Sequence, residues 1–278
     1  MEARVLCHAG VTGPGHDSCA KTLCGVPEAV RPFHFEMENP VSDVPALLEN
    51  LRDRRVIDLS QTLEEHMPHF PTHAMFFHNL WSSYARGGRS LHYLLVMHEH
   101  NGTHVDAPIH FLKNAQPEAH VTIERVPLTQ LMGRGVRVDC HSTKAGEYVS
   151  KSHLQKWEAS HGPIQAGDIV LFDFGWAANW GLRPDDQRYI ENWPGVGMDA
   201  AEYLLTKPAA AIGVDTLSPD PPEALRTRPI HPVVLEKQVL IIENLCNLDQ
   251  LPDFFVFLAF PLKIREGSGS PIRAVALV

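Results

Sequence analysis

The sequence has 278 residues, of which 44% are hydrophobic and 21% are charged, and its formal net charge is -9. This length and composition favour one globular domain with a sizeable core. The acidic balance, without any Lys/Arg cluster, argues against nucleic acid and membranes as partners.

The N-terminal region differs from the rest of the chain. It holds three of the five cysteines of the chain. Because the total is odd and the cysteines are unevenly distributed, they do not indicate a disulfide framework. A reducing compartment is the simpler interpretation, so we expect a cytoplasmic protein. No apolar run resembles a secretory segment or approaches the roughly 18 residues of a membrane span. We expect residues 1–40 to form a loosely ordered extension and residues 41–278 to form the domain.

Helical and strand patterns alternate along the remaining chain. Residues 42–55 predict a helix with Ser42 or Asp43 near its N-cap, and residues 55–63 predict a strand that leads into a loop with prolines. The later elements are expected as a strand at 90–100, a helix at 151–162, a strand at 168–174, a helix at 198–207 and strands at 208–215, 238–245, 254–264 and 271–278. Buried strands interleaved with a few helices predict a single α/β domain with a mixed sheet.

The stretch HEHNGTHVDAPIHF, residues 98–111, holds four histidines and one aspartate. On a helix, His100 and His104 would share a face, but Asp106 would point away and Gly102 disfavours the helix. On a straight strand the two histidines would lie about 13 Å apart. Ligands of one ion sit only about 2 Å from it. The chain must therefore bend between the histidines if they bind one ion, and Gly102 permits that bend.

Imidazole and carboxylate groups together suit Zn²⁺, Mn²⁺ or Fe²⁺. Two histidines and one aspartate leave coordination positions open for water, which is typical of a catalytic site. The chain has 17 histidines, and most of them are expected to be ordinary polar residues. We expect this ordinary role for His98, His120, His141, His153 and His161.

Residues 100–111, HNGTHVDAPIHF, match the pattern HxGTHxDxPxHF, so the chain resembles the cyclase-like metal-dependent hydrolases. These include bacterial kynurenine formamidase, isatin hydrolase and trans-dienelactone hydrolase. The segment IDLSQTLEEHMPHFP from Ile57 and the tail AFPLKIREGSGSPIRAVALV from Ala259 extend the resemblance over residues 54–278. It implies a mixed-sheet domain of the cyclase/kynurenine formamidase type, swivelling β/β/α-like.

The resemblance also implies roles for individual residues. It assigns metal binding to His100, His104 and Asp106, and the general acid/base role to His110. Members with two ions add a His and a Glu twelve residues apart, and His231 and Glu243 have that spacing. The expected cofactor is therefore one or two ions of Zn²⁺ or Mn²⁺. In having both His231 and Glu243, the chain resembles the formamidase, whereas its C-terminal tail from Ala259 resembles that of isatin hydrolase.

Other residues near the expected site have less specific patterns. Glu243 ends an apolar strand, where a carboxylate is costly unless it is paired or bound to a cation. Asp215 ends a buried strand and could shape the pocket. Phe70 and Trp81 could face an aromatic substrate, although ordinary core packing explains them equally well.

We expect a hydrolase that cleaves the C–N or C–O bond of a small cyclic amide, formamide or lactone with metal-activated water. His110 would transfer the proton, with an ordinary imidazole pKa near 6.5. The alternative is an arylformamidase acting on N-formyl-L-kynurenine in tryptophan catabolism.

Other chemistries have weaker support. The sequence contains no GxSxG pattern, so a serine hydrolase is unsupported. No pattern typical of a cysteine nucleophile surrounds Cys140 or Cys246. A non-catalytic metal protein and an Fe²⁺ oxygenase remain open. The resemblance implies a homodimer or homotetramer that takes a small-molecule substrate.

Overall fold

The computed structural model describes residues 44–114, 116 and 120–278. By its contacts the chain divides into two units, Met1–Ser42 and Asp43–Val278, and the description below concerns the second. The loosely ordered extension expected at residues 1–40 lies outside the described residues and stays a prediction. Among the described helices, none is both long and apolar enough to cross a membrane.

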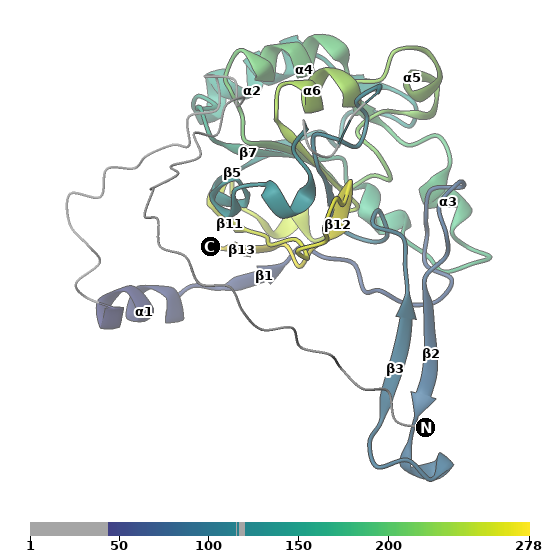
Figure 1. The fold of residues 1–278 in the computed structure, drawn as a ribbon. Coiled ribbons are helices and arrows are strands. Elements are labelled where there is room, and N and C mark those ends of the chain that lie inside the picture. The colour runs from purple at the N-terminus through teal and green to yellow at the C-terminus, as the bar shows by residue number, and fades with distance from the viewer. Residues whose placement is uncertain (1–43, 115, 117–119) are drawn as a thin grey trace, which may run out of the picture. The chain divides into compact units, whose positions relative to one another are not determined.

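The elements alternate along the chain (Figure 1). The α-helices are α1 (Val44–Arg52), α2 (Lys151–His161), α3 (Gln187–Ile190), α4 (Met198–Leu205), α5 (Pro222–Thr227) and α6 (His231–Glu236). The strands are β1 (Val56–Asp58), β2 (Phe77–Ser82), β3 (His92–Val96), β4 (His104–Asp106), β5 (Met132–Asp139), β6 (Tyr148–Val149), β7 (Ile169–Asp173), β8 (Gly195–Val196), β9 (Ala211–Val214), β10 (Leu240–Glu243), β11 (Phe254–Leu258), β12 (Gly269–Pro271) and β13 (Val275–Leu277). Short 3-10 helices include η1 (Tyr84–Arg86), η3 (Leu128–Leu131) and η4 (Trp176–Asn179).

A nine-stranded sheet forms the centre of the domain, in the order β1-β13-β11-β5-β7-β9-β10-β4-β12. The middle strands β5, β7, β9 and β10 are parallel, and antiparallel strands flank them on both sides. Parallel neighbours need crossover connections, and α2, α4 and α6 lie in these connections. The mixed α/β class expected from the sequence is confirmed.

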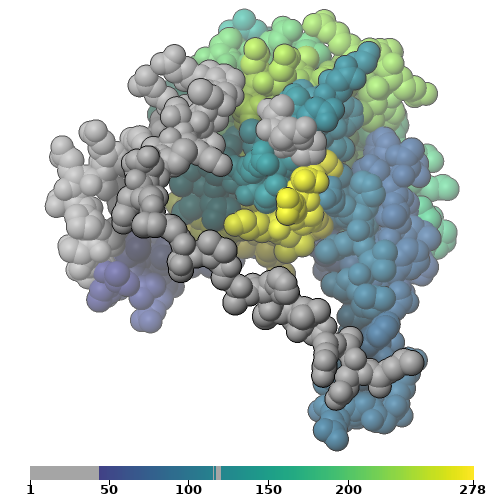
Figure 2. All heavy atoms as spheres, viewed as in Figure 1, coloured from purple at the N-terminus to yellow at the C-terminus, as the bar shows by residue number. Residues whose placement is uncertain are grey.

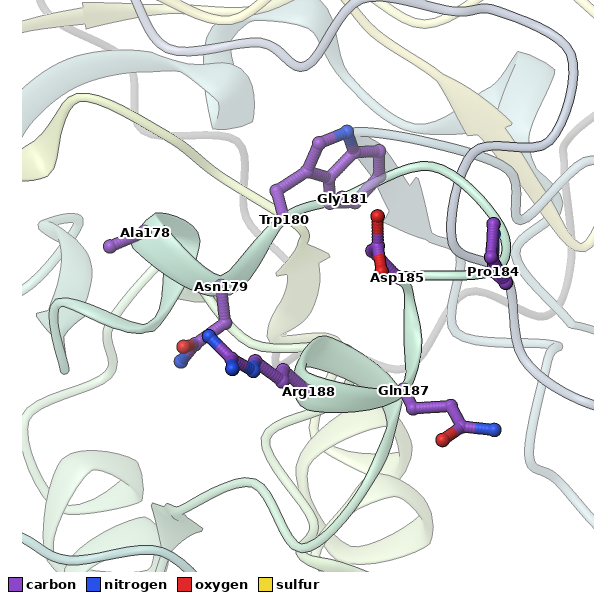
Figure 3. Close-up of a pocket in the computed structure, with 8 residues that line it drawn as sticks. All are labelled: Ala178, Asn179, Trp180, Gly181, Pro184, Asp185, Gln187 and Arg188. Atoms are coloured by element: carbon purple, nitrogen blue, oxygen red, sulfur yellow. The ribbon is translucent and has the colours of Figure 1, made fainter.

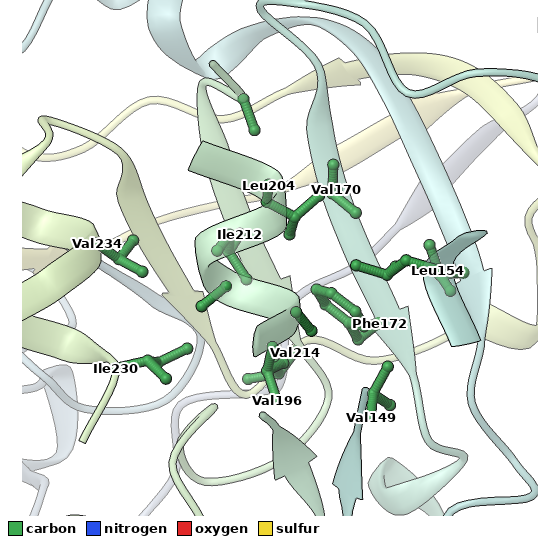
Figure 4. Packing of buried hydrophobic residues seen from close by; sticks show 14 of the residues in the cluster. Val149, Leu154, Val170, Phe172, Val196, Leu204, Ile212, Val214, Ile230 and Val234 are labelled. Atoms are coloured by element: carbon green, nitrogen blue, oxygen red, sulfur yellow. The ribbon is translucent and has the colours of Figure 1, made fainter. Parts of the chain in front are cut away.

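Both faces of the parallel strands are buried, which is why these strands are almost continuously apolar. On β7, Val170 and Phe172 belong to a hydrophobic cluster on one face of the sheet, where they pack beneath α2, α4 and α6 (Figures 1 and 4). The alternate residues Ile169 and Leu171 pack into a second cluster, with residues such as Phe257.

Some expected strands are markedly shorter in the structure. The strand expected at 55–63 ends at Asp58, and within 271–278 only Val275–Leu277 follows the end of β12. The apolar run at 90–100 is a strand only at His92–Val96, and residues 97–100 form the turn that leads to β4. The run at 254–264 is a strand only as far as Leu258. The sequence prediction also missed β5, a central strand whose sequence MGRGVRVD lacks a continuous apolar pattern.

Candidate metal centre

Neighbouring strands bring three of the candidate ligands together. His104 and Asp106 lie on β4, which pairs antiparallel with β10 so that Glu243 is directly opposite His104. Residues two apart on a strand project to the same side, as do directly opposed residues of paired strands. His104, Asp106 and Glu243 therefore share one side of the sheet. His100 lies in the turn before β4, and His231 begins α6.

The bend expected between His100 and His104 is present at Gly102. Its φ is +61°, a left-handed conformation, and a Cβ atom there would lie 2.4 Å from the Leu63 side chain. Because the chain turns back at this residue, the rings of His100 and His104 are 5.2 Å apart between centroids and almost perpendicular. Both can therefore face one point.

Asp106 lies at the centre of the five candidate ligands. Its Oδ1 atom is 2.6 Å from His100 Nδ1 and 3.5 Å from His104 Nε2. Its Oδ2 atom is 3.4 Å from His231 Nε2. Glu243 contacts the same imidazoles, with Oε2 3.3 Å from His104 Nε2 and Oε1 3.2 Å from His231 Nε2. All five side chains are buried, so two carboxylates and three imidazoles share a site away from water.

Two of these imidazoles donate their Nδ1 protons to groups outside the cluster. His231 Nδ1 faces the carboxylate of Asp220, which is fully buried and also accepts the backbone N–H of Ile230 at 2.7 Å. His104 Nδ1 lies 2.8 Å from the carbonyl oxygen of Gly102. Carbonyl and carboxylate oxygens only accept, so both Nδ1 atoms carry the proton. The Nε2 lone pairs of His104 and His231 are thus directed at the carboxylates.

His100 has the opposite tautomer. Its Nε2 atom lies 2.9 Å from Ser268 Oγ, and the Ser268 hydroxyl donates to Glu99 at 2.7 Å. Because this hydroxyl gives its own proton to Glu99, Ser268 accepts the Nε2 proton of His100. His100 Nδ1 therefore directs its lone pair at Asp106 Oδ1.

This arrangement fits a divalent cation. Three imidazole lone pairs face carboxylate oxygens, and Asp106 Oδ2 is buried without a hydrogen-bond partner among the described residues. Facing acceptors in a buried site repel unless a proton or a cation lies between them. Two groups of ligand atoms lie within 4.8 Å of one another, namely His100, Asp106 and His110, and His104, Asp106 and Glu243. Asp106 belongs to both groups.

The pKa shifts have the same origin. Burial alone would lower the pKa of His231, but its contacts with Asp106, Asp220 and Glu243 raise this pKa well above the ordinary value. Burial would also lower the pKa of His104, but the contacts with Glu243 and Asp106 outweigh burial and raise this pKa. Burial would raise the pKa of Asp106, yet the nearby His110 and His100 hold it well below its usual range. Raised imidazole pKa values are expected where protons take the places that a cation would occupy.

His110 lies in the turn after β4, and its ring stacks on His100 with centroids 3.8 Å apart. Burial, assisted by His100, lowers the pKa of His110 to about 4 against the opposing effect of Asp106. The expected ordinary pKa near 6.5 is therefore wrong for the metal-free chain. A neutral imidazole at this position can accept a proton.

The sequence prediction missed the outer groups that fix the histidine tautomers. Asp220 is eleven residues before His231, and Ser268 is far from His100 along the chain, so no local pattern connects them. Asn244 follows Glu243 with φ +59°, and its side-chain amide donates to the Gly102 carbonyl at 3.0 Å. In the sequence, the only indication that Asn244 belongs to the site is its position directly after the predicted ligand Glu243.

The remaining predicted residues have these positions. Phe70 packs against an aromatic cluster that contains Tyr189 and Trp193, whereas Trp81 is 69% exposed on β2. Their substrate contacts stay predictions. Asp215 is buried and accepts the backbone N–H of Trp176 at 2.6 Å, so it holds the start of η4. Burial and the neighbouring Asp173 raise the pKa of Asp215 to about 7.

A cavity of about 420 Å³ lies beside the end of η4, lined by residues including Trp180, Asp185 and Arg188 (Figure 3). None of the five candidate ligands lines it. The cavity is therefore separate from the candidate metal centre.

Comparison with known proteins gives concordant matches. A family model described as "Putative cyclase" matches residues 57–221, more than half of the chain. An isatin hydrolase from Roseibium aggregatum is 32% identical over 198 residues, which cover 66% of this chain and 73% of that protein. A kynurenine formamidase from Erythrobacter litoralis is 30% identical over 228 residues, which cover 80% of this chain and 93% of that protein.

A solved structure, an isatin hydrolase bound to the product analogue thioisatinate, superposes with a TM-score of 0.79 at 27% identity. The match covers 86% of this chain and 99% of that one. The sequence and structural matches agree on one family.

Proposed function

The chain belongs to the cyclase family and is a hydrolase, and we propose that it cleaves the C–N or C–O bond of a small cyclic amide, formamide or lactone at the candidate metal centre. The observation that supports the site most strongly is the convergence of three imidazole nitrogens on the Asp106 carboxylate. A divalent metal fits this donor set. We propose that it is Zn²⁺ or Mn²⁺, because both bind imidazole with carboxylate.

Two groups of ligand atoms bear on the number of ions, namely His100 with Asp106 and His110, and His104 with Asp106 and Glu243. Asp106 is shared by both groups, and its two oxygen atoms face different histidines. If two ions were bound, Asp106 would help to hold both, and His231, whose Nε2 lies 3.2 Å from Glu243 Oε1, would join Glu243 in holding the second. We therefore propose two ions, and one ion is the alternative if only His100, His104 and Asp106 bind.

When bound, the metal supplies Lewis-acid chemistry, lowering the pKa of a water molecule from 15.7 to about 7 and polarising the substrate carbonyl. The chain's own contribution is proton transfer by His110. The imidazole of His110 is neutral, because its pKa is about 4, and it stacks beside His100. We propose that His110, which stacks beside His100, accepts a proton from the attacking water and delivers it to the leaving nitrogen or oxygen.

The substrate is proposed from the relatives. An isatin hydrolase and a kynurenine formamidase both match well, and the substrates that their names imply are a cyclic amide and a formamide. We propose a cyclic amide of the isatin type or a lactone, with N-formyl-L-kynurenine as the alternative. Turnover of isatin, N-formylkynurenine and a dienelactone, each assayed with and without oxygen, distinguishes these substrates and excludes an oxygenase.

The test of the site combines metal analysis with activity. Chelator treatment is expected to remove one or two ions per chain and abolish hydrolysis, and added Zn²⁺ or Mn²⁺ is expected to restore it. His161→Ala on α2 serves as the control histidine and is expected to keep metal and activity. Full activity of the metal-free protein would refute the proposal.

Cys140 and Cys246 are free thiols, which supports the proposal of a reducing, cytoplasmic compartment. We also propose a homodimer or homotetramer.

A further inference from the structure

Tyr189 lies on the short helix α3, which reaches the surface at the right of the molecule (Figures 1 and 2). The preceding residues Gln187 and Arg188 are exposed, whereas Tyr189 is fully buried. Trp180 packs edge-on against the Tyr189 ring with centroids 4.9 Å apart, and the indole N–H of Trp176 donates to the Tyr189 carbonyl at 2.9 Å. These contacts hold the phenol ring with its hydroxyl inside the domain.

The hydroxyl of Tyr189 has two acceptors. It lies 2.8 Å from the side-chain oxygen Oδ1 of Asn244 and 3.1 Å from the backbone carbonyl oxygen of Asp215. Neither oxygen carries a proton, so the hydroxyl is the donor. Burial and the nearby Asp215 raise the pKa of Tyr189 well above its ordinary value, so the hydroxyl keeps that proton. The closer acceptor is the Asn244 side chain.

The direction of the Asn244 amide matters for the candidate metal centre. Its nitrogen Nδ2 donates to the Gly102 carbonyl at 3.0 Å, and the same carbonyl accepts the Nδ1 proton of His104 at 2.8 Å. An amide turned by 180° would direct its oxygen at the Gly102 carbonyl, so that two acceptors would face each other in a buried site. Because Asn244 Nδ2 is 3.5 Å from His104 Nδ1, the turned oxygen would also compete with Gly102 for the proton of His104.

The backbone of Asn244 does not decide this direction. Its carbonyl accepts the hydroxyl proton of Thr103 at 2.6 Å, and its N–H donates to the Thr216 carbonyl at 3.0 Å. These bonds place the side chain beside the bend at Gly102 for either direction of the amide. Among the described residues, the donor to Asn244 Oδ1 is Tyr189. The hydroxyl of Tyr189 therefore selects the direction in which the amide nitrogen faces Gly102.

We propose that Tyr189 is a positioning residue of the candidate metal centre, and that it acts on the imidazole of His104 through the Asn244 amide and the Gly102 carbonyl. The inference rests on the proposed function in that it takes His104 as a metal ligand. Groups that orient a metal-binding histidine affect metal affinity although they do not touch the metal.

Hydrogen exchange of the Asn244 side-chain amide, followed by heteronuclear NMR in chelator-treated protein, tests the first step without metal or substrate. Tyr189→Phe removes the hydroxyl and keeps the ring, and the amide is expected to exchange about tenfold faster or more. Tyr203→Phe is the matched control, because the Tyr203 hydroxyl donates to Glu158 outside the metal centre, and it is expected to leave this exchange unchanged. The backbone N–H of Leu171 in β7 reports global unfolding in the same samples.

Zinc affinity, measured by competition with a chromophoric chelator, tests the second step. Tyr189→Phe is expected to weaken zinc binding at the site that contains His104 by about 3–10-fold, which is the effect of one hydrogen bond. Asn244→Gly removes the amide, and glycine adopts the φ of +59° at this position without strain. Because Tyr189 acts through that amide, adding Tyr189→Phe to Asn244→Gly is expected to weaken zinc binding no further.

Two results would overturn the role of Tyr189. One is an unchanged exchange rate of the Asn244 amide in a folded Tyr189→Phe variant. The other is a further loss of zinc affinity when Tyr189→Phe is added to Asn244→Gly, since Tyr189 would then act by another route. A wild-type chain that binds no zinc, with faster exchange in Tyr189→Phe as expected, would refute the proposed metal centre and reduce Tyr189 to a structural role.

Discussion

Replacing Asp220 by Asn is expected to weaken metal binding although Asp220 is not a candidate ligand. The Asp220 carboxylate accepts the Nδ1 proton of His231 and the backbone N–H of Ile230. Asn keeps the size of the side chain but replaces one acceptor oxygen by a donor and removes the charge. His231 then loses the partner that directs its Nε2 lone pair at Asp106 and Glu243.

The magnitude follows from the bonds that change. A hydrogen bond to a charged group contributes about 1.5–3 kcal/mol, and about 1.4 kcal/mol corresponds to a tenfold change in affinity. Removing the partner of a metal-binding histidine typically costs 10–100-fold in metal affinity. We therefore expect the affinity of the site that contains His231 to fall by about 10–100-fold.

Titration of chelator-treated protein with Zn²⁺ against a competing chromophoric chelator measures this affinity directly. Asp168→Asn is the matched control, because Asp168 is also buried and pairs with Arg134 at 2.7 Å, outside the metal centre. The control is expected to lower the stability of the fold without changing zinc affinity. Unchanged affinity in a folded Asp220→Asn variant would show that Asp220 does not position His231.

Three further predictions concern the same site. His110→Ala is expected to lower hydrolysis by about 10²–10⁴-fold while metal content, measured by elemental analysis, is unchanged; loss of the metal would make His110 a ligand instead. Gly102→Ala is expected to destabilise the protein by about 1–2 kcal/mol in chemical denaturation, since φ is +61° and the new Cβ would meet Leu63, and wild-type stability would contradict the bend. The raised pKa values of His104 and His231 stabilise the metal-free fold fully below the ordinary pKa of about 6.5, and this contribution is lost as pH rises through the folded values. Denaturation midpoints of chelator-treated protein should therefore fall above neutral pH more steeply than those of zinc-loaded protein, and equal slopes would count against the proton-for-metal exchange.

Much of the metal centre could be predicted because its first residues are contiguous. His100, His104 and Asp106 lie within seven residues. The bend at Gly102 could be predicted because both histidines must lie close to the same ion, which a straight strand does not allow. The ligand roles themselves stay predictions. The hydrogen bonds of Asp220 and Ser268 could not be predicted, because folding alone brings these residues beside the histidines.

The fold shows the same division. Strand β7 has a continuous apolar sequence and was predicted within one residue at each end. Strand β5 was missed, because its glycines do not match a strand pattern. In the structure, a Cβ at Gly135 would lie 2.2 Å from the Phe255 ring, so the glycine makes room for a neighbouring strand's side chain. That requirement depends on a partner strand more than a hundred residues away.

The lowered pKa of His110 is a third example. An imidazole has an ordinary pKa in the absence of structure, and its shift to about 4 arises from burial beside His100. Burial at a single residue is a property of the folded chain, so this pKa could not be predicted from the sequence.

The central claim is that His100, His104 and Asp106 bind one divalent cation, and anomalous diffraction from crystals soaked in Zn²⁺ or Mn²⁺ tests it most directly. The account predicts an anomalous peak about 2 Å from His100 Nδ1, His104 Nε2 and an Asp106 oxygen. A soaked crystal without that peak, in which the three side chains point away from one another, would contradict it.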